Sequence, residues 1–474
     1  MKSGNRIAYV LLFSFGLVLA LIAANKNQPY LMMLRGVGNT TIILASIVVL
    51  AGLLWRSWWR QGHLGKLAIV VWCLPPLLLL CGHLSFEQTK RVVLRADPVQ
   101  VRKLGPHFMV GYTSFSEVAL LAQTGLIGGI YITGHNIRGR SAEALRDEIS
   151  ALQDIRRAAS LPPLFVAADQ EGGIVGHLSP PLTRLPALAT LAELPPDDRE
   201  EKAQAFGRIH GRELAALGVN LNLAPVLDLR PEGRTRLDFN TLIGQRAISA
   251  DPRVVSELAQ AYVSGLQGSG VSATVKHFPG LGRVRADTHH FSAELDTPQA
   301  QLEAADWRPF REVLASSNAQ LMIGHVTLSA IDPARPASHS KRVVDGIIRN
   351  EWNYQGIVMT DDLVMGAIYQ HDVCTAVTEA LNAGVDLLLV AIDGSQFYRL
   401  FACALDASRH GRLDGAMLRQ SEARLGRGAP RTPRPELAHL VRHTLGKSER
   451  IDADGPVAPV AGVVGTVELP GVEH

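Results

Sequence analysis

The sequence predicts an α/β protein consisting of a single (β/α)8 TIM-type barrel preceded by about three transmembrane helices. The barrel prediction rests on eight short apolar runs between residues 108 and 390, most of which end at or next to a polar or charged residue. Segments with helical spacing, such as 200–217 and 251–267, separate these runs. Strands and helices that alternate in this way are typical of parallel α/β folds, and eight such units fit a barrel.

The membrane prediction rests on the amino-terminal segment. The chain has 474 residues, of which only 19% are charged, and its mean hydropathy of +0.11 is high for a soluble protein. Three apolar runs account for the excess: Ile7–Ala24, Thr41–Trp55 and Leu67–Leu84. The first and third are long enough to span a bilayer, and the second is marginal. A cleaved signal peptide would explain only the first run, so we predict three spans.

The charges that flank the three runs do not by themselves set the orientation. Five basic residues lie on one side of the predicted spans, namely Lys2, Arg6, Arg56, Arg60 and Lys66. Five lie on the other side, namely Lys26, Arg35, Lys90, Arg91 and Arg95. Long domains translocate largely regardless of charge. Lys90, Arg91 and Arg95, which precede the long domain, therefore count less toward the orientation. We therefore predict a cytoplasmic amino terminus, anchoring in the inner (cytoplasmic) membrane and a large domain outside the cytoplasm.

The eight predicted strands follow in order along the chain. They are 108–112, 129–133, 164–168, 221–226, 273–275, 321–324, 356–360 and 386–390. A doubly wound open sheet is the alternative, but no Gly-rich nucleotide fingerprint follows the first run. We place the membrane anchor at residues 1–88, the barrel at 89–425, and a Pro/Gly-rich tail, expected to be disordered, at 426–474.

The most informative motif follows the fifth predicted strand. It reads Lys276-His277-Phe278-Pro279-Gly280-Leu281-Gly282, and after four residues Asp287-Thr288-His289. Pro and Gly interrupt regular structure, so the polar groups fall on a loop beyond the strand's carboxyl end. Barrel enzymes carry their chemistry at that end. An Asp-x-His pair can set a carboxylate against an imidazole and tune its basicity.

This motif resembles the signature of the β-N-acetylglucosaminidase (β-hexosaminidase) branch of glycoside hydrolase family 3. The family pattern is Lys-His-Phe-x-Gly-His-Gly, four residues, and Asp-Ser/Thr-His; Leu281 replaces its second histidine. Four further blocks match the family: 169–173 (Asp-Gln-Glu-Gly-Gly), 222–228, 243–246 and 356–363. Ile174 replaces an arginine and Gln245 an aspartate of the family pattern. The resemblance covers about residues 105–400.

The resemblance implies a retaining β-N-acetylhexosaminidase that hydrolyses terminal β-linked N-acetylglucosamine, on peptidoglycan-derived sugars. It makes Asp361 the nucleophile, which forms the covalent glycosyl-enzyme, and His289 the acid/base with Asp287 as its orienting partner. It implies no cofactor and no metal. The residues that it assigns to substrate binding are Asp169, Arg246, Lys276 and His277.

Neighbouring residues leave some assignments open. Asp362 is expected to point away from the barrel mouth and to cap the following helix, unless Asp361 is itself the cap. Family spacing selects His289 over the adjacent His290, which is given a structural role. Asp228 is as readily structural as functional. His325, after the sixth strand, either touches the substrate or merely lines the mouth.

Three other functions remain open. The departures at 174, 245 and 281 are compatible with a membrane-tethered, inactive sugar-binding homologue or with a β-glucosidase-like enzyme of the same family. A metal-dependent barrel hydrolase would use His277, His289, His325 and Asp361.

The net charge of +3 is too small to imply nucleic acid. Cys374 and Cys403 are expected to be buried free thiols. The sequence does not determine protein partners, oligomeric state, aglycone or the second-step acceptor.

Overall fold

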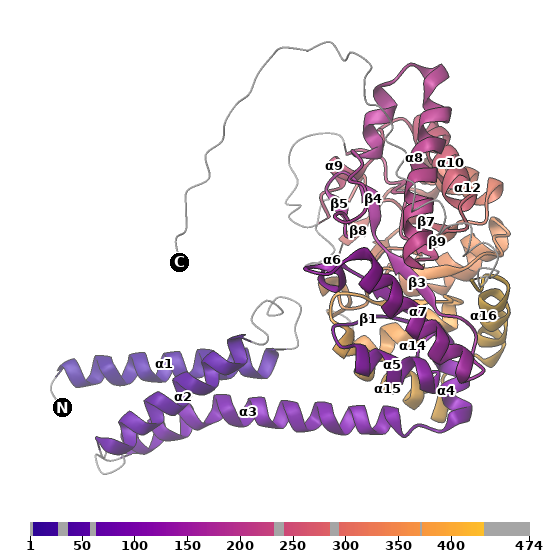
Figure 1. Cartoon of the computed structure of the whole chain (residues 1–474). Helices are drawn as coiled ribbons and strands as arrows, with labels where there is room; N and C mark the ends of the chain where they lie inside the picture. Colours follow the sequence, from indigo (N-terminus) through magenta and orange to yellow (C-terminus); the bar gives the residue numbers. More distant parts are fainter. Residues whose placement is uncertain are drawn as a thin grey trace. The chain divides into compact units, whose positions relative to one another are not determined.

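The structure is a computed structural model that describes residues 3–26, 37–56, 63–231, 241–284, 293–369 and 372–430 (Figure 1). The predicted tail lies outside the described residues from 431 onward, as do Asp287, His289 and His290. The last described helix, α16 (Gly415–Arg427), runs past residue 425, where the barrel was predicted to end.

Within the described residues, the main sheet has eight strands, all paired in parallel with their neighbours. These are β1 (Phe108–Gly111), β2 (Gly129–Ile132), β3 (Phe165–Ala168), β6 (Leu221–Asn222), β7 (Ser272–Phe278), β9 (Gln320–Ile323), β11 (Val358–Thr360) and β12 (Leu388–Val390). The two end strands, β11 and β12, are joined by a parallel bridge between Met359 and Leu387. The sheet is therefore a nearly closed barrel, and the α/β barrel prediction is confirmed at this level.

Among the described residues, each strand is followed by a main helix of nine or more residues that covers the outside of the barrel, as Figure 1 shows for α5, α7 and α15. In chain order these are α5 (Phe115–Thr124), α7 (Ala142–Ala158), α8 (Pro196–Leu217), α10 (Pro252–Gln267), α12 (Arg308–Ser316), the π-helix η6 (Arg342–Glu351), α14 (Val373–Ala383) and α15 (Phe397–Arg409). Each helix runs back from the carboxyl end of the strand before it. The first turns of these helices therefore lie at the barrel mouth, where the strands end.

Local sequence explains where several helices begin and end. The Asp251 carboxylate accepts the Arg253 N–H at 2.9 Å at the start of α10, and Asp372 accepts the Thr375 N–H at 2.9 Å at the start of α14. Short acidic side chains at this position satisfy amide groups that have no partner inside the helix. Gly384 ends α14 with φ of 93°, a left-handed conformation that glycine adopts at little cost.

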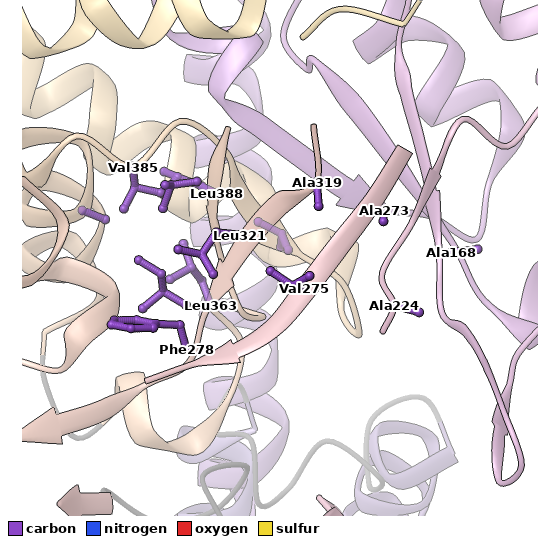
Figure 2. Close-up of a cluster of buried hydrophobic side chains, with 14 of the residues drawn as sticks. Ala168, Ala224, Ala273, Val275, Phe278, Ala319, Leu321, Leu363, Val385 and Leu388 are labelled. Atoms are coloured by element: carbon purple, nitrogen blue, oxygen red, sulfur yellow. The ribbon is translucent and has the colours of Figure 1, made fainter. Parts of the chain in front are cut away.

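The core divides into two layers because side chains alternate along each strand. Met109, Tyr131 and Leu389 belong to a small cluster inside the barrel. Their neighbours Val110 and Leu388 belong to the large cluster between the strands and the helices. Figure 2 shows part of that outer cluster, with Val275 of β7 beside Leu321 of β9, its partner in the parallel register.

Shorter elements surround this frame. At the mouth lie the hairpin of β4 (Gln170–Gly172) and β5 (Val175–Gly176), the parallel pair β8 (Ala293–Leu295) and β10 (Val326–Leu328), and the helical turn α9 (Ile243–Arg246). The other short helices are α4 (Pro98–Leu104), η3 (Gly105–His107), α6 (Gly134–Ile137), η4 (Leu188–Glu193), α11 (Gln299–Ala304), η5 (Ala337–His339), α13 (Gly366–Tyr369) and η7 (Gly394–Gln396).

The amino-terminal segment forms α1 (Ser3–Asn25), α2 (Val37–Trp55) and α3 (His63–Leu94). Among the described residues, two helices are long and apolar enough to cross a membrane, Gly38–Trp55 and His63–Leu94, and Val10–Asn25 is a shorter apolar helix. Three membrane helices are thus not confirmed. Helix α3 also continues without interruption past residue 88, where the anchor was expected to end.

The prediction of two free thiols at 374 and 403 is wrong. Cys374 in α14 and Cys403 in α15 form a disulfide whose Cα atoms lie 4.9 Å apart. The helices that follow adjacent strands pack side by side, which brings together cysteines that are 29 residues apart in sequence. Cys73 and Cys81 in α3 are free.

A fully buried carboxylate ties the amino-terminal end of the barrel together. Asp386 accepts hydrogen bonds from the guanidinium groups of Arg349 at 2.7 Å and Arg424 at 2.9 Å. It also accepts from the Ser421 hydroxyl at 2.6 Å and the Val358 N–H at 2.8 Å. One side chain thereby joins η6, β11 and α16.

Replacing Asp386 with Ala should lower the free energy of unfolding by about 3–5 kcal/mol, because two buried guanidinium groups would lose their counter-charge. Chemical denaturation followed by circular dichroism measures this. Asp345→Ala is the control, since the contact of Asp345 with Lys341 is long, at 4.0 Å, and partly exposed, and the substitution should cost less than about 1 kcal/mol. Equal effects of the two substitutions would contradict this role of Asp386.

Candidate active site

The polar residues singled out in the sequence gather at the carboxyl ends of the barrel strands. Lys276 lies in β7 and Asp169 directly follows β3. The Lys276 ammonium contacts the Asp169 carboxylate and lies 2.7 Å from Oε1 of Glu171. Only 3% of the Lys276 side chain is exposed, so these ion pairs are formed out of water.

Glu171 also binds Arg246, which lies at the end of α9. The Arg246 guanidinium donates to both carboxylate oxygens of Glu171, through Nε at 2.9 Å and Nη2 at 2.6 Å. A third donor, Nη1, reaches the Thr241 carbonyl at 2.9 Å. Paired donors of this kind fix the plane of the guanidinium. Glu171 thus holds Lys276 and Arg246 on the same carboxylate.

His277 is held by a different carboxylate. Its Nδ1 lies 2.7 Å from Oδ2 of Asp228, which also accepts the His277 backbone N–H at 3.2 Å. The other oxygen of Asp228 accepts the Leu281 N–H at 2.6 Å. The Arg246 Nη2 group lies 3.4 Å from His277 Nε2. The network therefore assigns the proton to Nδ1 and leaves Nε2 as an acceptor facing Arg246.

The ionisation of this cluster is stable because its charges balance. Burial raises the pKa of Asp169, but the Lys276 ammonium and the His177 ring outweigh burial, and the pKa lies well below its usual range. Burial likewise opposes a low pKa at Glu171, yet Arg246 and Lys276 lower it. Burial lowers the pKa of Lys276, and the two carboxylates raise it above its ordinary value. The cluster of Asp169, Glu171, Lys276 and Arg246 therefore holds two anions and two cations at neutral pH.

Asp361 directly follows β11. In that strand Met359 belongs to the inner cluster and Val358 to the outer one, so alternation places Asp361 on the inner side. Its Oδ1 accepts the Asp362 N–H at 2.8 Å. Asp361 and Lys276 are thus carried by the same end of the barrel, on strands β11 and β7 that flank β9.

Asp362 is buried and binds the backbone. Its carboxylate accepts N–H groups from Ala391 at 3.0 Å and Ile392 at 2.9 Å, just after β12, and from Val364 at 3.0 Å. Burial raises the pKa of Asp362 to about 6, against the effect of these three donors, and the neighbouring Asp361 charge adds to the rise. Asp362 therefore links the ends of β11 and β12 beside Asp361.

His325 is buried behind the mouth, with 1% of its surface exposed. Its Nε2 lies 3.0 Å from the Asp362 carbonyl, and its Nδ1 lies 2.8 Å from the Ser338 hydroxyl. A carbonyl only accepts, so Nε2 donates to it. These contacts connect His325 to the backbone that carries Asp361 and Asp362.

Sequence reasoning missed two contributors to the site. Glu171 belongs to the Asp-Gln-Glu-Gly-Gly block, but its bonds to Lys276 and Arg246 join segments that are far apart in sequence. No local pattern of residues predicts these bonds. Tyr131 of β2 donates its hydroxyl to Asp169 at 2.5 Å; the signal available in the sequence was a polar aromatic residue inside the apolar run 129–133. Within the described ranges, no group of three His, Cys, Asp or Glu residues is arranged to hold a metal ion.

The three departures from the family pattern fall in different surroundings. Ile174 lies in the β4–β5 hairpin with 49% of its surface exposed, and Leu281 is 4% exposed. Gln245 is exposed on α9, where it precedes Arg246. The arginine next to it is held by Glu171 and by backbone, so this contact does not depend on an acidic residue at 245.

The model of the glycosyl hydrolase family 3 N-terminal domain matches residues 102–427. The chain belongs to this family of glycoside hydrolases. A β-hexosaminidase of Nitrosomonas eutropha is 35% identical over 310 residues, which cover 63% of this chain and 85% of that protein. A β-hexosaminidase of Pseudomonas aeruginosa is 35% identical over 268 residues, which cover 56% of this chain and 76% of that protein.

Solved structures lead to the same family. A family 3 β-N-acetylglucosaminidase from a Paenibacillus species superposes with a TM-score of 0.64 at 30% identity; the match covers 76% of this chain and 64% of that one. A β-N-acetylhexosaminidase from Beutenbergia cavernae gives 0.62 at 28% identity, over 69% of this chain and 98% of that one. The family assignment made from the motifs is confirmed.

Glu171→Gln keeps the shape of the side chain but removes the anion between Lys276 and Arg246. We expect KM to rise by about tenfold or more, with a smaller change in kcat, because each lost charge-assisted hydrogen bond is worth about 1.5–3 kcal/mol. Steady-state kinetics on a chromogenic β-N-acetylglucosaminide measures both constants. Glu257→Gln, on α10 with one 4.0 Å contact to Arg199, should behave as wild type. An unchanged KM for Glu171→Gln would contradict this role.

Proposed function

We propose that this family 3 glycoside hydrolase removes terminal β-linked N-acetylglucosamine with retention of configuration. One observation carries the proposal: Asp361 lies on the inner side of β11 at the same end of the barrel as the Lys276–Glu171–Arg246 cluster. A carboxylate at the mouth supplies the nucleophile that a retaining glycosidase requires, and the cluster beside it supplies hydrogen-bonding groups for the sugar. The names of the relatives support the sugar, and peptidoglycan-derived saccharides are the substrate class we propose.

In the proposed reaction, the Asp361 carboxylate attacks the anomeric carbon as the glycosidic bond breaks. His289 gives a proton to the departing oxygen, and Asp287 orients the imidazole and stabilises its charged form. Water then attacks the anomeric carbon of the glycosyl-enzyme, His289 takes a proton from that water, and the bond to Asp361 breaks to release the sugar. The dyad lies outside the described residues, so its roles rest on the sequence. Asp169, Arg246, Lys276 and His277 bind the sugar hydroxyls.

The charge state of the cluster suits this chemistry. An oxocarbenium-like transition state carries positive charge that the Asp361 carboxylate stabilises. Lys276 and Arg246 are each neutralised by carboxylates, so they offer N–H donors without adding net positive charge beside the reacting carbon. An imidazole as acid/base also avoids a second anion close to Asp361.

Asp361→Asn should reduce turnover by several orders of magnitude, since the amide cannot form the covalent intermediate. Sugar binding should persist, because the cluster around Glu171 is unchanged. The assay is the release of a chromophore from a β-N-acetylglucosaminide, with the matching β-glucoside as the test of specificity. Near wild-type turnover by the Asn variant would remove Asp361 from the role. Faster cleavage of the glucoside would favour a β-glucosidase-like enzyme.

His289→Ala should slow substrates with poor leaving groups far more than activated aryl glycosides, because an activated phenolate departs without protonation. With an activated substrate the glycosyl-enzyme should accumulate, and added azide should restore turnover. Comparing kcat/KM across a series of leaving groups measures the effect. His290→Ala is the adjacent control and should stay close to wild type. A large loss for His290→Ala with little for His289→Ala would show that the other histidine is the acid.

We further propose that α1, α2 and α3 anchor the chain in the inner membrane, with residues 1–88 as anchor and the catalytic barrel, 89–425, outside the cytoplasm. The tail, 426–474, is proposed as a separate segment. The apolar runs support the anchor. The Cys374–Cys403 disulfide supports the location, because disulfides persist in oxidising compartments and are rare in the cytoplasm.

Removal of residues 1–84 should release an active, soluble protein that retains Phe86 and Lys90, two residues that contact the barrel. Protease added outside intact spheroplasts should digest the barrel of the full chain, and Cys374 and Cys403 should resist alkylation until a reductant is added. A cytoplasmic marker protein is the control for leakage. A protected barrel with freely alkylated thiols would place the domain in the cytoplasm.

A further inference from the structure

Helix α3 joins the apolar segment to the barrel without a break. The Phe86 ring packs edge-on against Tyr398 with 5.8 Å between centroids. One turn later, the Lys90 ammonium lies 2.5 Å from Glu117 and 4.9 Å from the centre of the Tyr398 ring. The Tyr398 hydroxyl in turn donates to Glu117 at 2.6 Å. Val93, near the end of α3, is fully buried in the outer core. This end of α3 is thus part of the barrel domain.

These contacts lie at the mouth end of the barrel. Glu117 is in the first turn of α5 and Tyr398 is in the first turn of α15. Outer helices begin beyond the carboxyl ends of the strands, where the active site is. After α3 the chain continues through α4, and Gln100 of α4 accepts a hydrogen bond at 2.6 Å from Ser408, in the last turn of α15.

The chain therefore runs from the mouth to the opposite end of the barrel between Phe86 and Gln100. It follows that the part of α3 before Phe86, which contains the apolar run 67–84, projects beyond the mouth. At about 1.5 Å per residue, the end of that run and Phe86 are separated by only about 3 Å along the helix. Pro75 and Pro76 lie within the apolar run, and no proline follows them in α3.

Three exposed apolar side chains lie in segments that follow strands of the barrel. Phe115 is 41% exposed, Ile174 49% and Ile392 54%, and they follow β1, β3 and β12. These strands belong to one half of the sheet, in the order β3-β2-β1-β12. Helix α3 packs on the helices that follow β1 and β12. Apolar side chains next to a membrane helix are typical of surfaces that rest on the lipid interface.

We propose that the barrel mouth faces the bilayer surface and that the enzyme acts on N-acetylglucosamine residues held at that surface. The substrate class is a membrane-embedded glycolipid with a short headgroup that ends in β-linked N-acetylglucosamine. The inference rests on the proposed function and on α3 lying in the membrane. Phe115 and Ile392 touch the interface, and α3 sets the orientation of the mouth toward it.

The test uses the full chain in lipid vesicles. Three substrates are compared: a glycolipid whose sugar lies next to the headgroup, the same lipid with the sugar raised by a rigid oligoproline spacer, and a soluble chromogenic β-N-acetylglucosaminide. Ten prolines in the extended helix add about 31 Å. Wild type should cleave the short glycolipid at least about fivefold faster than the spaced one, since a mouth that faces the lipid cannot reach a distant sugar.

The variant Phe115→Ser should lose about fivefold or more on the short glycolipid and keep its rate on the soluble substrate within about twofold, because only contact with the lipid interface is weakened. Val99→Ser is the matched control: Val99 is 59% exposed but lies in α4, away from the mouth, and both rates should stay unchanged.

Faster cleavage of the spaced glycolipid than of the short one would overturn the proposed orientation while leaving the glycosidase function intact. Cleavage of the soluble substrate alone would do the same. Failure to cleave any of the three substrates would instead reject the proposed function, and the inference about the membrane with it.

Discussion

The pairing of one buried carboxylate with two cations supports the whole mouth of this barrel. Glu171 binds Lys276 at 2.7 Å and Arg246 at 2.6 Å, and all three side chains are nearly excluded from water. Charges in such surroundings are tolerated only when each has a partner, because burial of a single unpaired ion is very costly. The segment after β3, helix α9 and strand β7 are thereby held in one arrangement before a sugar binds. Electrostatic catalysis requires such a preorganised arrangement of charges and dipoles.

The alternation of side chains along the strands connects this cluster with Asp361. The same period of two that sends Val358 to the outer core sends Met359 inward and puts Asp361 at the inner edge of the mouth. Asp362 then faces backbone N–H groups after β12, and His325 contacts its carbonyl. Asp362 therefore has two roles: it holds the backbone beside the proposed nucleophile, and it joins the ends of β11 and β12 where the barrel closes.

Much of the fold was predictable because the strands and helices are determined by short stretches of sequence. Strands buried on both faces appear as continuous apolar runs, and each of the eight predicted runs overlaps a strand of the barrel. Contacts between distant segments were not predictable in this way. The bonds of Glu171 to residues 246 and 276, the Cys374–Cys403 disulfide and the continuation of α3 to Leu94 each depend on how elements pack, which neither spacing nor composition records. The family motifs predicted Lys276 and Asp361 as site residues but did not predict the contacts that hold them.

The most direct test of the account is to trap the glycosyl-enzyme. A fluorinated N-acetylglucosaminyl donor, which transfers its sugar readily but is hydrolysed slowly, is incubated with the full chain, and the mass of the protein and its peptides is measured. The account predicts a gain of one sugar, located on Asp361 and absent from Asp361→Asn. A sugar attached to any other residue, or the absence of an adduct together with an inverted product, would contradict it.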